Sequence, residues 1–240
     1  MPAASPSIAV PPSPPPRRAA PWRRAFAAVL ALLLAWSGSG LQAWDVDRLR
    51  AAALRLGPRA VAGAEALEQQ LAAAAVLDEG ARLQAVNRFF NQRIQFRDDK
   101  LVWGQVDHWA SPLETLGQGQ GDCEDFAIAK YFSLLAVGVP VSRLRLVYVR
   151  AQIGGPQGVV QAHMVLAYHP TPDAEPLILD NLIGEIRPAS RRPDLSPVFS
   201  FNGDGLWQGV GNASAGDPVA RLSRWRDVLA KSRAEGFQSQ

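Results

Sequence analysis

The spacing of apolar residues changes near the middle of the chain and predicts helices before that point and strands after it. Between residues 45 and 92 apolar residues recur every three or four positions, which is typical of amphipathic helices, and Gly57-Pro58 interrupts the pattern. After residue 144 apolar and polar residues alternate, as in strands with one buried face. The pattern therefore predicts an α+β domain with an N-terminal helical region.

One buried helix is expected to join the two parts. Apolar residues at helical spacing run from Phe126 to Leu135, and Asp122 is a good N-cap. Gly138 and Pro140 then end the helix, because glycine suits the left-handed cap position and proline cannot continue the hydrogen bonding.

The remaining elements follow from the same patterns. The polar segment 94–99 is predicted to be a short connection, and the prolines and glycines after Ser190 predict loops. The predicted strands lie at residues 144–149, 161–168 and 177–180, with a final helix at residues 218–233.

Residues 1–43 differ in composition from the rest of the chain. A proline- and alanine-rich stretch, expected to be disordered, precedes paired arginines and an apolar run of eleven residues. A membrane-spanning helix needs about 20 apolar residues, so basic residues, a short apolar run and a small-residue exit predict an export signal cleaved after Ala43. We therefore expect a leader at 1–43 and one domain at 44–240. An uncleaved membrane anchor is the alternative.

The basic character of the chain comes from this leader. The chain has 25 basic and 22 acidic residues, a net charge of +3. Four of the basic residues are leader arginines, and the leader contains no acid, so 21 basic residues face 22 acidic ones in the domain. No basic stripe interleaved with aromatic residues remains there, and we therefore do not expect nucleic-acid binding.

The chain contains one cysteine, Cys123, in the first turn of the predicted helix. One cysteine excludes an intrachain disulfide and a zinc site built from several thiolates. Free backbone N–H groups and the helix dipole favour a nucleophilic thiolate at this position. Asp122, Glu124 and Asp125 oppose this, because nearby carboxylates raise the pKa of a thiol. A reactive cysteine here needs something cationic to neutralise these acids.

A cysteine nucleophile also needs a base and a third group that orients the base. Of the three histidines, His163 lies inside a predicted strand, and Asp180 ends the strand expected to pair with it. A carboxylate there can accept from one imidazole nitrogen and leave the other for the thiol. His108 and His169 are expected to be structural or surface groups. The pattern fits a Cys123–His163–Asp180 triad, and it also fits a strand histidine with a purely structural role.

The acids around Cys123 suggest a second chemistry. Asp122, Glu124 and Asp125 supply hard oxygen ligands, which suit calcium. Bound calcium would offset the negative charge that suppresses the thiolate. Acids are also ordinary in the first turn of a helix, so a solvated helix start without a metal is the alternative.

The segment Gly121-Asp122-Cys123-Glu124-Asp125-Phe126, continuing to Phe132, closely resembles the bacterial transglutaminase-like cysteine proteinases, specifically periplasmic proteases of the LapG type. The resemblance implies a papain-like, transglutaminase-like fold, in which the cysteine helix packs on an antiparallel sheet that carries histidine and aspartate. It covers most of residues 44–210 and continues, in order, through VNRFFN at 86–91, WASPLE at 109–114, HMVLAY at 163–168, PLILDN at 176–181 and FSFN at 199–202.

Position by position, the resemblance implies that Cys123 is the nucleophile, His163 the base and Asp180 the orienting carboxylate. It implies that Asp122 and Glu124 bind calcium, with Asp125 a weaker candidate for the same role. The chain departs from the family in its proline-rich leader and at residue 108, where the family often has tyrosine.

The resemblance also implies a function and partners. Such proteases cleave the N-terminal region of large surface adhesins at a dialanine site, and they depend on calcium. An inner-membrane receptor for cyclic di-GMP sequesters them and so controls biofilm detachment. We therefore expect a periplasmic cysteine endopeptidase. Two alternatives stay open: transglutaminase-type acyl transfer to an amine, which uses the same triad, and a non-catalytic calcium-dependent binding module.

Overall fold

The computed structural model describes residues 44–238, so the predicted export signal lies outside the described residues. Within the described part, no helix is both long and apolar enough to cross a membrane. The division of the chain into a leader and a domain at residue 44 stays a prediction.

The N-terminal part is helical, as predicted. The break at Gly57 is present: this glycine has φ 104°, and Pro58 occupies the first turn of the next helix, where its missing N–H costs nothing. A second break, which the sequence did not reveal, precedes an N-cap at Asp78, whose carboxylate accepts from the backbone N–H of Ala81. The helices are α2 (Val46–Leu56), α3 (Pro58–Ala75) and α4 (Glu79–Arg93).

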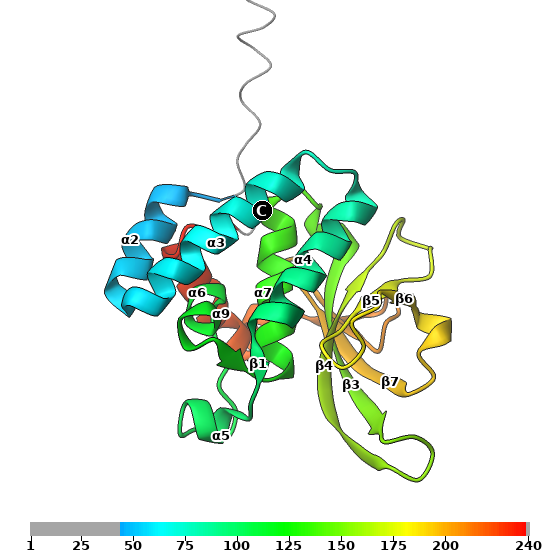
Figure 1. Cartoon of the computed structure of the whole chain (residues 1–240). Coiled ribbons are helices and arrows are strands. Elements are labelled where there is room, and N and C mark those ends of the chain that lie inside the picture. The colour runs from blue at the N-terminus through cyan, green and yellow to red at the C-terminus, as the bar shows by residue number, and fades with distance from the viewer. Residues whose placement is uncertain (1–43, 239–240) are drawn as a thin grey trace, which may run out of the picture. The chain divides into compact units, whose positions relative to one another are not determined.

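The predicted buried helix is α7 (Cys123–Ala136), and every residue from 125 to 135 is buried. A helix that is apolar on all sides is stable only when it is surrounded. In Figure 1 α7 lies between the helical layer, which includes α4, and the sheet. The other helices are α5 (Asp99–Val102), α6 (Pro112–Gln118), α8 (Pro218–Arg221) and α9 (Ser223–Ala234), with 3₁₀ turns at η1 (Val141–Arg143) and η2 (Ala189–Arg191).

An antiparallel sheet follows α7. The large sheet has the order β6-β5-β4-β3-β7-β8-β9, and all of its neighbouring strands are antiparallel. It contains β3 (Leu144–Ile153), β4 (Val159–Tyr168), β5 (Leu177–Leu179), β6 (Arg187–Pro188), β7 (Leu195–Phe201), β8 (Leu206–Gln208) and β9 (Ser214–Gly216). The three predicted strands are therefore confirmed, and with the helices they confirm the α+β fold.

The prediction of loops after Ser190 was wrong, because β7, β8 and β9 lie there. Pro197 breaks the sequence pattern, but it lies opposite Val149, where the register between β3 and β7 shifts. Proline is tolerated at such irregularities because no ladder hydrogen bond is lost. The predicted connection 94–99 also contains two short elements, β1 (Gln95–Phe96), paired in parallel with β2 (Gln120–Gly121), and the start of α5.

The two faces of the sheet carry different cores. Met164 and Leu166 belong to the main core around α7, whereas Val165 and Ala167 belong to a smaller cluster on the other face. This alternation is the period of two seen in the sequence. It fixes the register of β4, the strand that carries His163, against the start of α7.

Candidate active site

Cys123 is held at the start of α7 by a compact cap. The Asp125 carboxylate accepts from the backbone N–H of Asp122 at 3.4 Å and from that of Ala110 at 2.8 Å. Gly121 is required before this turn, because a Cβ there would lie 2.5 Å from the Asp125 carboxylate. The cap thus fixes the thiol at the helix end where backbone N–H groups are free.

His163 and Asp180 form a buried pair across neighbouring strands. The Nε2 atom of His163 lies 2.8 Å from Oδ1 of Asp180, and the side chains are 2% and 0% exposed. Oδ1 also accepts from the backbone N–H of Asn181 at 2.7 Å. An ionised carboxylate can only accept hydrogen bonds, so the Nε2 atom of His163 must carry the proton that it donates to Oδ1. The Nδ1 atom of the neutral imidazole is then left as an acceptor.

The charge of Asp180 is stabilised from two sides. Burial alone would raise the pKa of this carboxyl, but hydrogen bonding and charge from His163 and a hydrogen bond from Arg192 lower it to about 2. The Nη2 atom of Arg192 lies 2.7 Å from Oδ2 of Asp180. Asn91 of α4 donates its side-chain amide to the Asp180 carbonyl at 2.8 Å. Sequence reasoning assigned no role to either residue, although Asn91 ends the VNRFFN motif, because both contacts join separate segments of the chain.

Cys123 and His163 face one open cavity of about 480 Å³. The backbone N–H of Met164, the residue after His163, donates to the Cys123 sulfur, so β4 runs directly beside the start of α7. Trp109, stacked on Phe201, forms part of the cavity wall. Cys123 and His163 thus line the same cavity, and the Asp180 carboxylate binds the imidazole of His163.

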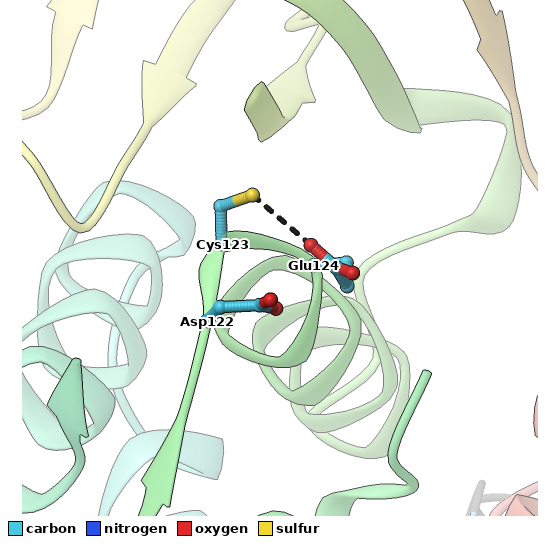
Figure 2. Close-up of side chains that lie close together, drawn as sticks. All are labelled: Asp122, Cys123 and Glu124. Atoms are coloured by element: carbon cyan, nitrogen blue, oxygen red, sulfur yellow. Dashed lines mark hydrogen bonds between the residues drawn. The ribbon is translucent and has the colours of Figure 1, made fainter. Parts of the chain in front are cut away.

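The thiol itself is hydrogen-bonded to an acid. Its sulfur donates to Oε2 of Glu124 at 3.0 Å, as Figure 2 shows. Burial raises the pKa of the Cys123 thiol, and the charges of Glu124 and Asp122 raise it further. The conflict predicted from the sequence is therefore present: the helix start favours a thiolate, whereas its acidic neighbours hold the proton on sulfur.

These acids belong to a larger cluster. Ligand atoms of Asp122, Cys123 and Glu124 lie within 4.8 Å of one another, and Glu124 forms a similar group with Asp99 and Asp107. Asp99 forms a third group with Asp122 and Asp125, so all three acids predicted to bind calcium lie in the cluster. Sequence reasoning missed Asp99 and Asp107. Their position in the acidic segment before the cysteine loop is the one signal that could have suggested them.

Positive charge meets the cluster at Asp107, where Nη2 of Arg224 lies 3.1 Å from Oδ2, whereas no salt bridge among the described residues reaches Asp122, Glu124 or Asp125. Burial and then the charge of Glu124 raise the pKa of Asp122 to about 9, and burial also raises the pKa of Glu124 and of Asp125. One carboxylate oxygen of Asp122 and one of Asp99 are buried without a described hydrogen-bond partner. Such a set of close, unsatisfied oxygen atoms fits a divalent cation with hard ligands. Asp125 is the least available, because it caps the helix.

The remaining histidines have structural surroundings. The backbone N–H of His108 donates to the Asp99 carboxylate, and its ring packs against Trp103 at a tilt of 33°, with the centroids 4.3 Å apart. His169 is buried, and its pKa is lowered by burial and by the charge of Arg145. Neither residue lines the cavity that contains Cys123.

Comparisons with known proteins agree with this geometry. Residues 62–193 match the family model described as "Bacterial transglutaminase-like cysteine proteinase BTLCP". A structure of Legionella pneumophila LapG is 38% identical, covers 78% of this chain and 97% of its own, and has a TM-score of 0.67. The EGTA-treated form is 38% identical, covers 78% of this chain and 97% of its own, and has a TM-score of 0.69. The calcium-bound form is 37% identical, covers 78% of this chain and 98% of its own, and has a TM-score of 0.65. A search of curated proteins gave no match. This chain belongs to the bacterial transglutaminase-like cysteine proteinases.

Proposed function

We propose that this protein is a calcium-dependent cysteine endopeptidase that uses Cys123 as nucleophile, His163 as base and Asp180 as orienting group. The observation that carries the proposal is the buried His163–Asp180 pair, whose histidine lines the same cavity as the single thiol. Membership of a cysteine proteinase family supports it.

The proposed reaction is acyl transfer to water. Nδ1 of His163 takes the thiol proton, and the thiolate attacks the scissile carbonyl carbon. The imidazolium then gives this proton to the leaving amine as the peptide bond breaks and the thioester remains. Next, His163 takes a proton from water, the hydroxide attacks the thioester carbonyl and the C–S bond breaks, the carboxylic product leaves, and the imidazolium returns its proton to the sulfur. The backbone N–H of Cys123 at the helix start is the natural donor to the oxyanion.

Calcium is assigned to the acidic cluster. Asp122 and Glu124 would hold it, and the structure suggests Asp99 and Asp107 as further oxygen ligands. When bound, calcium would supply positive charge that offsets the carboxylates around the thiol. The relative Legionella pneumophila LapG has been described in calcium-bound and EGTA-treated forms, which supports the same ion here.

A polypeptide substrate suits the open edge of β4. This strand pairs with β5 over residues 166–168, whereas residues 159–162 are exposed and have no described strand partner on that side. An extended peptide can add to such an edge through backbone hydrogen bonds. The edge leads directly to Met164, whose N–H meets the Cys123 sulfur.

We also propose a substrate, a regulatory partner and a place of action, all from the resemblance to the LapG-type proteases. The substrate is a large repeat-containing surface adhesin cleaved in its N-terminal region at a dialanine site. The regulatory partner is an inner-membrane cyclic di-GMP receptor that sequesters the protease and controls biofilm detachment. The place of action is the periplasm, reached through the export signal at residues 1–43, with an uncleaved membrane-anchored form as the alternative.

One experiment tests the activity and its alternatives together. Purified residues 44–240 and the Cys123→Ala variant are incubated with N-terminal adhesin fragments that contain Ala-Ala, in calcium or EGTA, with and without a labelled primary amine. Cleavage at Ala-Ala by wild type in calcium alone is expected. Amine incorporation without peptide release would show a transglutaminase. Calcium binding without either reaction would show a binding module.

A further inference from the structure

We infer that Arg192 is a positioning residue of the active site: it holds the Asp180 carboxylate in the orientation that aims Oδ1 at Nε2 of His163. The inference rests on the proposed function, because it gives the Arg192–Asp180 contact a role in orienting the base. Arg192 lies in a segment that neither the sequence pattern nor the family motifs pointed to.

The two oxygens of Asp180 have separate sets of partners. Oδ1 accepts from His163 and from the backbone N–H groups of Asn181 and Leu182, at 2.7 and 3.2 Å. Oδ2 accepts from Nη2 of Arg192 at 2.7 Å. A carboxylate turns easily about its terminal bond, whose torsional preferences are broad. The Arg192 contact fixes this turn, since any rotation that moves Oδ1 away from His163 also breaks the bond to Oδ2.

Arg192 is itself fixed by a second carboxylate. Its Nε and Nη2 atoms donate to Asp194 at 3.0 and 2.7 Å, and its side chain is only 1% exposed. A planar guanidinium can bond both carboxylates in one rigid geometry, whereas lysine offers a single flexible point charge. Asp194 is partly exposed, so the chain from Asp194 through Arg192 and Asp180 ends at the buried imidazole.

The other groups around Asp180 do not replace this contact. The charge of Lys130 on α7 interacts with that of the Asp180 carboxylate, but the Nζ atom of Lys130 is buried without a described hydrogen-bond partner. Asn91 binds the Asp180 carbonyl rather than its carboxylate. Arg192 is therefore the cation that bonds directly to Asp180 among the described residues.

The competing interpretation is a purely structural ion pair that joins the end of β5 to the segment before β7. The two interpretations differ in what happens to His163. A positioning role predicts a changed imidazole tautomer and a lower kcat with little change in KM, whereas a structural role predicts lower stability with an unchanged imidazole. The chain has three histidines, so their imidazole ¹⁵N signals can be assigned singly.

The test uses ¹⁵N-histidine-labelled residues 44–240 in saturating calcium, as wild type, Arg192→Gln, Arg192→Lys and Arg143→Gln. Arg143 makes an ion pair of the same 2.7 Å length with Glu79, so it controls for loss of an arginine–carboxylate pair. In wild type we expect His163 as the Nε2–H tautomer with a slowly exchanging proton. In Arg192→Gln we expect mixed tautomers, fast exchange and a kcat reduced by about 10- to 100-fold, as for a displaced catalytic group. Arg192→Lys should recover part of the loss.

Wild-type His163 signals and kcat in folded Arg192→Gln would overturn the inference, and so would an equal kcat loss in Arg143→Gln. If Arg192→Gln does not fold, the Arg192→Lys variant decides, because lysine cannot bond the carboxylates of Asp180 and Asp194 with one planar group. Wild-type His163 signals and a wild-type kcat in Arg192→Lys would then overturn the inference. Failure of wild type to cleave any adhesin fragment would count against the proposed function, whereas the imidazole signals would still report the positioning.

Discussion

The two halves of the candidate site differ in their electrostatics: the half on the sheet pairs opposite charges, whereas the half at the start of α7 brings like charges together. On the sheet, His163, Asp180 and Arg192 alternate donors and acceptors, and the pKa of Asp180 falls to about 2. At the start of α7, acids crowd together around a buried thiol, and the pKa of Asp122 rises to about 9. In the sheet half, residues of the chain itself balance the charge of the Asp180 carboxylate. In the helix half, the carboxylates around the thiol keep excess negative charge until a cation binds.

This difference says where control of activity can lie. The sheet half is buried, and both carboxylate oxygens of Asp180 accept hydrogen bonds, so it should keep its arrangement with or without calcium. The helix half holds the thiol proton through Glu124, so its state should depend on the ion.

The largest expected effect comes from removing one reacting group from each half. Cys123→Ala and His163→Ala should each lower kcat/KM for adhesin cleavage by about a thousandfold or more, the scale seen for catalytic triads. The double variant should lose little more, because the groups act as a unit. Asp180→Asn should also be severe, since an amide cannot hold the same tautomer. Activity of Cys123→Ala near the wild-type value would end the nucleophile assignment.

The next prediction concerns only the helix half. Asp122→Asn combined with Glu124→Gln should weaken calcium binding, measured by calorimetric titration of chelator-treated protein, by about tenfold or more, because affinity follows ligand charge. Asp99→Asn and Asp107→Asn should do the same to a smaller extent. Calcium should also raise the melting temperature of wild type, because only the folded state has the site.

The control is Asp173→Asn, in the connection between β4 and β5, which lies outside the clustered carboxylates. It should bind calcium as wild type does. Equal calcium affinity in the Asp122→Asn/Glu124→Gln variant, or full cleavage in excess chelator, would show that these acids are plain helix caps and would remove the basis of the comparison.

The sequence revealed the two halves unequally. Cys123 and its flanking acids are adjacent along the chain, and His163 and Asp180 lie on strands whose alternation is visible, so local patterns were enough. Asp107 and Arg192 lie in irregular segments and Asp99 begins the short helix α5, and no periodicity of the sequence predicts where such segments lie in the fold. The same limit explains β7: Pro197 interrupts its pattern, and only the bulge opposite Val149 makes that proline acceptable.

Lys130, on the sheet side of α7, offers a smaller test through stability. Burial lowers its pKa to about 7, although the charge of Asp180 opposes the shift. Between about pH 7 and 10.5 the unfolded chain binds this proton and the folded chain does not, so the free energy of unfolding should rise with pH. Lys130→Met should remove that slope and stabilise the protein at pH 7 by a few kcal/mol.

Denaturant unfolding across this pH range checks the prediction, with Lys100→Met as the exposed control. The control should keep the wild-type slope. A Lys130→Met variant that keeps the slope as well would show that the buried ammonium already has a partner, and the sheet half would then contain more positive charge than the contacts described here.

The effect furthest from catalysis is expected at Glu235, which lies outside both halves. Its buried carboxyl accepts from the Ser111 hydroxyl and, at 3.2 Å, from the backbone N–H of Leu113, so it anchors the start of α6 just after the loop that carries Asp107. Burial raises its pKa from 4.5 to about 7, although both hydrogen bonds oppose the shift. A raised carboxyl pKa means that stability is full below pH 4.5 and falls as pH rises through about 7.

Glu235→Gln keeps an oxygen acceptor for Leu113 and loses the charge, so it should remove this fall, a difference of roughly 3 kcal/mol in the free energy of unfolding at pH 8. Glu185→Gln, at an exposed acid, should unfold as wild type does. The decisive comparison is the wild-type slope with calcium and with chelator. Because Glu235 is not among the clustered carboxylates, the slope should be the same in both. A slope that disappeared on chelation would couple α6 to the acidic half, and the cation would then control the cavity wall as well as the thiol.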